Sequence, residues 1–62
     1  MKRYILSIVL NSGNKSRYEI YSENDKFLNQ RILICKDIYT SNKVFIITNQ
    51  IAKIEIISVS KR

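Results

Sequence analysis

The sequence predicts an all-β protein: a small five-stranded antiparallel barrel that forms a single domain over residues 1–62. Two observations lead to this prediction. Apolar residues, many of them isoleucine, alternate with polar residues along several short segments, which is the pattern of half-buried strands. Polar turn segments separate these runs at roughly regular intervals, and regular spacing of short strands favours a small barrel or sandwich.

The first two strands are expected at residues 3–10 and 17–22. In the second, Tyr18 and Ile20 point to one side and polar residues mostly to the other. The segment 11–16, NSGNKS, holds the only glycine and two asparagines, which tolerate the positive φ of a turn. The two strands should therefore pair as a hairpin. The apolar face of the first strand should be core and consists of Tyr4, Leu6, Ile8 and Leu10.

Residues 22–39 allow two interpretations. The sequence SEND at 22–25 can cap a short helix over residues 23–31. Alternatively, a tight turn leads into a long, bent strand from 27 to 39, whose second half, ILICKDIY, is rich in β-branched residues. We favour the long strand and keep the short helix as the alternative.

The last two strands are expected at residues 44–48 and 51–59, after a turn at 40–43. The Asn49-Gln50 pair between them is a poor two-residue hairpin, because glutamine disfavours positive φ. We therefore expect one helical turn near 49–52, capped by Thr48 or Asn49, with Ile51 pointing inward. Both strand faces are apolar near 56–59, so a bulge or burial on both sides is expected there.

This order of strands, with a helical turn before the last one, resembles the SH3-like small barrel. The resemblance covers the whole chain as topology, and no family motif accompanies it. It therefore implies an architecture and assigns no functional residue, because such folds have many unrelated functions.

The residue types that catalysis and metal binding need are scarce. The chain has no histidine, one cysteine and one glycine. Cys35 thus lacks a base to activate it, the common zinc ligand sets cannot form, and no glycine-rich phosphate loop exists. We expect a non-enzymatic protein without catalytic, cofactor-binding or metal-binding residues. Cys35 lies in an apolar run and should be in the core, together with Tyr18, Phe27 and Phe45.

The N-terminus resembles the start of a signal peptide, with Lys2 and Arg3 followed by YILSIVL. This apolar segment is only about seven residues long, at the short limit for a signal peptide, and no small-residue cleavage site follows it. No apolar run approaches the ~18 residues that a membrane span needs. We expect a cytoplasmic protein with no membrane partner.

The apolar content favours binding to protein. A chain of this size buries only ~60% of its surface on folding, so its own core is marginal. Residues 32–35, 44–47 and 56–57 are apolar on both strand faces, and one of the two faces would be exposed on a monomer. We expect an accessory, regulatory or inhibitory factor that forms a homo-oligomer, binds a partner protein, or both. The expected contact residues are Ile34, Ile47, Ile56, Ile57 and Val59.

Nucleic-acid binding is the alternative function. The formal charge is +6, and four of the basic residues lie at the two ends of the chain. Between residues 4 and 60, seven basic and five acidic residues leave a balance of only +2. Small barrels bind single strands by stacking bases on aromatic residues over a basic groove, and the termini would add a basic patch if they meet. The candidate residues are Lys2, Arg3, Lys15, Arg17, Tyr21, Lys43, Lys61 and Arg62.

Overall fold

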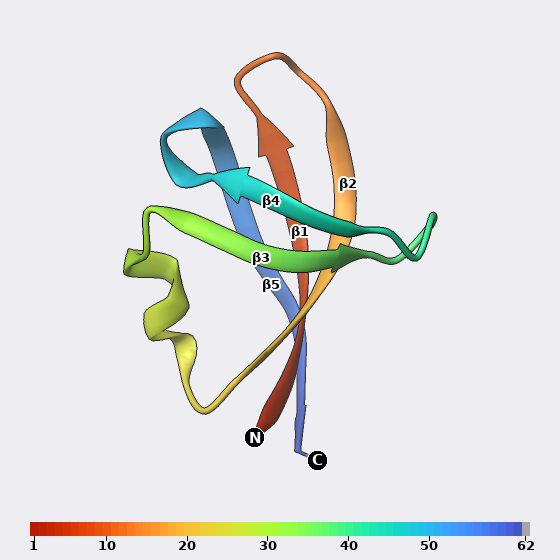
Figure 1. The fold of residues 1–62 in the computed structure, drawn as a ribbon, viewed down its shortest axis with the longest axis vertical. Coiled ribbons are helices and arrows are strands. Elements are labelled where there is room, and N and C mark those ends of the chain that lie inside the picture. The colour runs from red at the N-terminus through yellow and green to blue at the C-terminus, as the bar shows by residue number, and fades with distance from the viewer. Residues whose placement is uncertain (62) are drawn as a thin grey trace.

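The computed structural model describes residues 1–61, which form five strands and two short 3₁₀ helices (Figure 1). All strand pairs are antiparallel, and the strands form one sheet in the order β4-β3-β2-β1-β5. The predicted all-β fold with five antiparallel strands is confirmed. The sheet does not close into a barrel, because β4 and β5 remain its two edges. In chain order the elements are β1 (Lys2–Leu10), β2 (Lys15–Ser22), η1 (Asp25–Asn29), β3 (Ile32–Asp37), β4 (Lys43–Ile47), η2 (Thr48–Gln50) and β5 (Ile51–Lys61).

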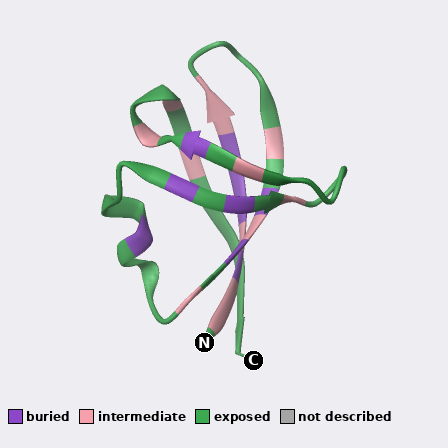
Figure 2. Ribbon diagram, in the orientation of Figure 1, coloured by how far each residue is buried: buried purple, intermediate pink, exposed green. Residues whose placement is uncertain are grey.

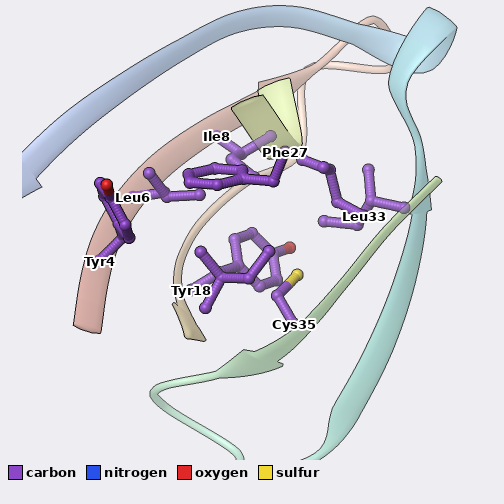
Figure 3. Packing of buried hydrophobic residues seen from close by; sticks show 9 residues of the cluster. Tyr4, Leu6, Ile8, Tyr18, Phe27, Leu33 and Cys35 are labelled. Carbon is purple, nitrogen blue, oxygen red and sulfur yellow. The ribbon is translucent and has the colours of Figure 1, made fainter. Parts of the chain in front are cut away.

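The sheet bends so strongly that β3 and β4 pass across β1 and β5 (Figure 1). Its inner face is thereby folded onto itself, and the apolar side chains of β1 and β2 meet those of β3 and β4 (Figure 3). Leu6 and Ile8 are fully buried there, as the alternation in the first strand predicted. The buried cluster consists of Tyr4, Leu6, Ile8, Tyr18, Ile20, Phe27, Leu33, Cys35 and Ile46.

The segment between β2 and β3 corrects one expectation. The favoured long strand from residue 27 is wrong: residues Asp25–Asn29 form the 3₁₀ helix η1, and β3 begins only at Ile32. Asn24 caps η1, with its Oδ1 accepting from the Lys26 N–H at 2.8 Å. The helical turn carries Phe27 into the core, where its ring packs edge-on against Tyr4 with centroids 4.9 Å apart. The alternative of a short helix was therefore the correct one.

Phe45 corrects a second expectation, because it is exposed instead of lying in the core. Buried and exposed stretches alternate along β3, as Figure 2 shows. The register of β3 with β4 places Ile46 opposite Leu33 and Phe45 opposite Ile34. Leu33 faces inward, so Ile46 does too, and the alternation of side chains turns Phe45 outward.

The helical turn before the last strand is confirmed and begins slightly earlier than expected, at Thr48–Gln50. The expected capping by Thr48 or Asn49 is wrong, since η2 has no side-chain cap. Instead, the Thr48 N–H and Oγ1 both donate to the Arg31 carbonyl, at 2.8 and 3.0 Å. Ile51 is half-buried and packs against the core.

The expected irregularity near 56–59 is confirmed as a bulge in β5. Leu6 lies opposite Ile56 and Ile5 opposite Ser58, so Ile57 is an extra residue on β5. Neither helix within residues 1–61 is long and apolar enough to cross a membrane.

Candidate interaction surfaces

The outer side of the β3–β4 hairpin is an apolar surface. Ile32 lies opposite Ile47 and Ile34 opposite Phe45, and these four residues form what we call the outer hairpin face. Their exposed fractions are 48%, 53%, 53% and 64% for Ile32, Ile47, Ile34 and Phe45. The residues between them, such as Leu33 and Ile46, face inward and complete the core. Four large apolar side chains side by side in solvent are typical of a contact surface.

Basic residues lie at both ends of the outer hairpin face. Lys36 and Lys43 are directly opposite each other at one end, on the same side of the hairpin as Ile34 and Phe45. At the other end, Arg31 and Ile47 line the same shallow hollow. Within residues 1–61 neither lysine forms an ion pair. Like charges directly opposite each other on a sheet are destabilising, so this end favours a bound anion.

A groove of about 370 Å³ adjoins the outer hairpin face where β2 and β3 diverge. Tyr21 and Ile34 line it together with Lys36 and Lys43. Glu19 lies opposite Lys36 in the register, but its carboxylate is bound to the Arg3 Nε. This hydrogen bond, with a contribution from Tyr21, raises the pKa of Arg3. The carboxylate opposite Lys36 on the neighbouring strand is therefore already paired with Arg3.

A second apolar surface, the β5 edge, consists of Ile56, Ile57 and Val59. These side chains are 41%, 45% and 50% exposed, respectively. They lie on a strand that pairs only with β1 in the described chain, so its other edge is open along Ile51–Lys61. Open edges present unpaired backbone groups to other chains.

The five predicted contact residues are thus all exposed, but they fall on two surfaces at opposite ends of the strand order. Ile34 and Ile47 belong to the outer hairpin face, and the other three form the β5 edge. Sequence reasoning missed Ile32 and Phe45. The spacing of 32 and 34 would have placed Ile32 beside Ile34 on one strand face. Phe45 was missed because it was assigned to the core.

The predicted nucleic-acid residues do not form one surface. Lys2 lies opposite Lys61, so the termini meet and part of the expected basic patch exists (Figure 1). Arg3 points to the other face and pairs with Glu19. Lys15 and Arg17 lie towards the far end of the β1–β2 hairpin, opposite Val9 and Ser7. Tyr21 and Lys43 line the groove. Arg62 lies outside the described residues.

Cys35 is buried in the core, as predicted. Burial, with a smaller effect of the Asp37 carboxylate, raises the pKa of its thiol to about 11. A thiol with such a pKa is protonated at neutral pH and is a weak nucleophile. In residues 1–61 no three cysteine, aspartate or glutamate side chains gather in a way that could hold a metal ion.

Comparisons of the chain with protein-family models, with curated proteins and with solved structures find no match.

Proposed function

We propose that this protein is a small, non-enzymatic interaction module that binds another protein through its outer hairpin face. The observation that supports this most directly is the exposure of Ile32, Ile34, Phe45 and Ile47 on a hairpin whose inner side already fills the core. The exposed half of each side chain adds nothing to the stability of the folded chain, whereas covering it on binding is favourable by up to about 1–2 kcal/mol per side chain.

The proposed scaffold is an SH3-like small barrel that is open between β4 and β5. The strand order and the helical turn η2 directly before β5 support this topology. Its opening leaves two edges that can each accept a strand from another chain.

Self-association through the β5 edge is the second part of the proposal. Ile56, Ile57 and Val59 are exposed on an open strand of eleven residues, Ile51–Lys61. Light scattering at micromolar concentration should give the mass of a dimer or a larger assembly, and Ile57→Asp should reduce it. Lys26→Asp serves as the control, since Lys26 is exposed on η1. A wild-type monomer would contradict self-association and leave the outer hairpin face untested by this measurement.

Site-specific photo-crosslinking in the native cell tests the main proposal. A photoreactive phenylalanine analogue at position 45 should form an adduct with a protein, because Phe45 is the most exposed residue of the face at 64%. The same analogue at Lys26 should not form this adduct. No protein adduct at position 45, or equal adducts at both positions, would contradict protein binding at this face.

Nucleic-acid binding is the second candidate function. The pairing of Lys2 with Lys61 at the joined termini favours it, as do Tyr21 and Phe45, both exposed on the outer side near Lys36 and Lys43. Fluorescence anisotropy with a labelled single-stranded oligonucleotide should then show affinity that falls with salt, with a log–log slope of about −0.7 per phosphate contact. No binding at low salt would exclude this function.

A further inference from the structure

We infer that the occupant of the outer hairpin face is an extended, acidic segment of a partner protein, with apolar residues in its middle and carboxylates at both ends. This inference rests on the proposed function and specifies the chemistry of the partner. It follows from the charges around the face, from the state of the chain's own acidic groups and from the open edge of β4.

The first step is the arrangement of cations along the hairpin. Lys36 and Lys43 mark one end of the apolar strip and Arg31 the other. From Ile32 to Lys36 the strand advances about 13 Å, at ~3.3 Å per residue. A complementary segment therefore has about three residues between its acidic ends, so that both acidic side chains and the middle residue point towards the outer hairpin face.

The second step is that, among residues 1–61, no acidic group forms an ion pair with Arg31, Lys36 or Lys43. The Asp37 carboxylate accepts hydrogen bonds from Ser16 and from the N–H groups of Tyr39 and Thr40, at 3.1, 2.8 and 3.2 Å. Three other acidic groups are engaged in ion pairs within the described chain: Glu19 with Arg3, Glu23 with the N-terminus of Met1, and Glu55 with Lys53. Carboxylates from a partner would remove the repulsion between Lys36 and Lys43.

The third step concerns a second copy of this chain, which fits the same face poorly. In a two-fold contact the face would meet itself, so Lys36 and Lys43 would approach the basic ends of an identical strip. Like-charge contacts of this kind oppose association, whereas an acidic segment is attracted over a distance. Self-association is left to the β5 edge.

The fourth step is the open edge of β4. Within residues 1–61 β4 pairs only with β3, so its backbone N–H and C=O groups on the other side are available. An extended segment can add there as a sixth strand, which places alternate side chains on the same side of the sheet as the outer hairpin face, next to Phe45 and Ile47 of β4. Main-chain hydrogen bonds then provide affinity, and the apolar strip with its cationic ends provides specificity.

Selection from a library of displayed random peptides against the intact protein tests this inference. We expect enrichment of sequences in which three to five residues, mainly apolar, lie between aspartate or glutamate residues. A selected peptide, resynthesised, should bind the variant Lys36→Glu/Lys43→Glu at least about tenfold more weakly, consistent with the loss of two charge pairs and new repulsion. The matched control is Lys15→Glu/Lys26→Glu, which changes the net charge equally at distant exposed sites and should bind like the wild type.

The variant Ile34→Asp separates this inference from the proposed function. If the selected peptides are neutral or basic and do not bind Ile34→Asp, the inference of an acidic partner is overturned, whereas protein binding at this face is supported. Peptides that bind Ile34→Asp as well as the wild type would contradict both. An empty selection would overturn the inference of a peptide-like partner segment. A homodimer that is disrupted by Ile34→Asp but not by Ile57→Asp would also overturn it. Displacement of the bound peptides by an oligonucleotide would do the same.

Discussion

Phe27 and Phe45 occupy opposite environments in the folded chain. Phe27 is 4% exposed and packs against Tyr4, whereas Phe45 is 64% exposed on the outer hairpin face. The apolar run from Val44 to Ile47 offers two faces of similar hydrophobicity. Which face is inner depends on the register with β3, and a long-range register of this kind is not encoded in the local pattern.

Alanine substitution of each phenylalanine measures this difference. Phe27→Ala should lower the free energy of unfolding by about 3–5 kcal/mol, because it removes a buried ring and leaves a cavity. Phe45→Ala should change it by less than about 0.5 kcal/mol, as at other exposed positions. Urea unfolding followed by circular dichroism checks both values. Equal losses in the two variants would mean that the assignment of inner and outer faces is wrong.

The buried thiol of Cys35 makes stability depend on alkaline pH. Its pKa is raised to about 11 in the folded protein, above the ~8.5 of an unfolded thiol. The unfolded chain therefore loses this proton first, so the contribution is fully present below about pH 8.5 and disappears as the pH rises through about 11. Burial also raises the pKa of Tyr18, which acts in the same direction.

Unfolding measured between pH 8 and 10.5 should therefore show a steady loss of stability, with a smaller slope in Cys35→Ala. The slope that remains in this variant reports Tyr18. In the native wild-type protein, a thiol reagent at pH 8 should react slowly with Cys35, and rapidly after unfolding in urea. Rapid reaction of the native protein, or identical slopes for the two proteins, would contradict the burial of this thiol.

At the scale of elements, the hairpins could be predicted and the connections only in part. Alternation gave the β1–β2 hairpin, whose turn contains Gly13 with φ of 94°. The strand is apolar on both faces near 56–59, and this predicted an irregularity that the structure has as a bulge at Ile57. Helix η1 was the less favoured alternative because its residues have mixed propensity for helix and strand. The contact that favours it joins Phe27 to Tyr4, more than twenty residues away in the sequence.

The carboxylate of Asp37 accepts three hydrogen bonds at the turn between β3 and β4. Asp37 Oδ1 accepts from the N–H groups of Tyr39 and Thr40, and Oδ2 accepts from Ser16, which ties the turn to β2. Asp37→Ala should therefore destabilise the protein by about 1–2 kcal/mol. Asp37→Asn keeps one acceptor oxygen and should recover part of this loss. Thermal unfolding of the two variants checks the order, and an alanine variant as stable as the wild type would exclude this role.

At the scale of the whole molecule, the sequence predicted that apolar surface would remain exposed but not how it is distributed. The size of the chain and its two-sided apolar runs were sufficient for the first conclusion. The division into the outer hairpin face and the β5 edge depends on strand order, and so do the positions of Lys36, Lys43 and Arg31 around the former. A basic patch at the termini was expected only if the two ends of the chain came together. The pairing of Lys2 with Lys61 meets this condition.

The central claim is that the outer hairpin face binds a protein. Affinity capture from the native cell, after nuclease treatment, tests it most directly when wild type, Ile34→Asp and Lys15→Glu/Lys26→Glu are compared side by side. We predict a captured protein that is retained by the wild type and the lysine control and lost with Ile34→Asp, although all three remain folded by circular dichroism. The claim would be contradicted if the protein were captured only without nuclease treatment, or if Ile34→Asp captured it as well as the wild type.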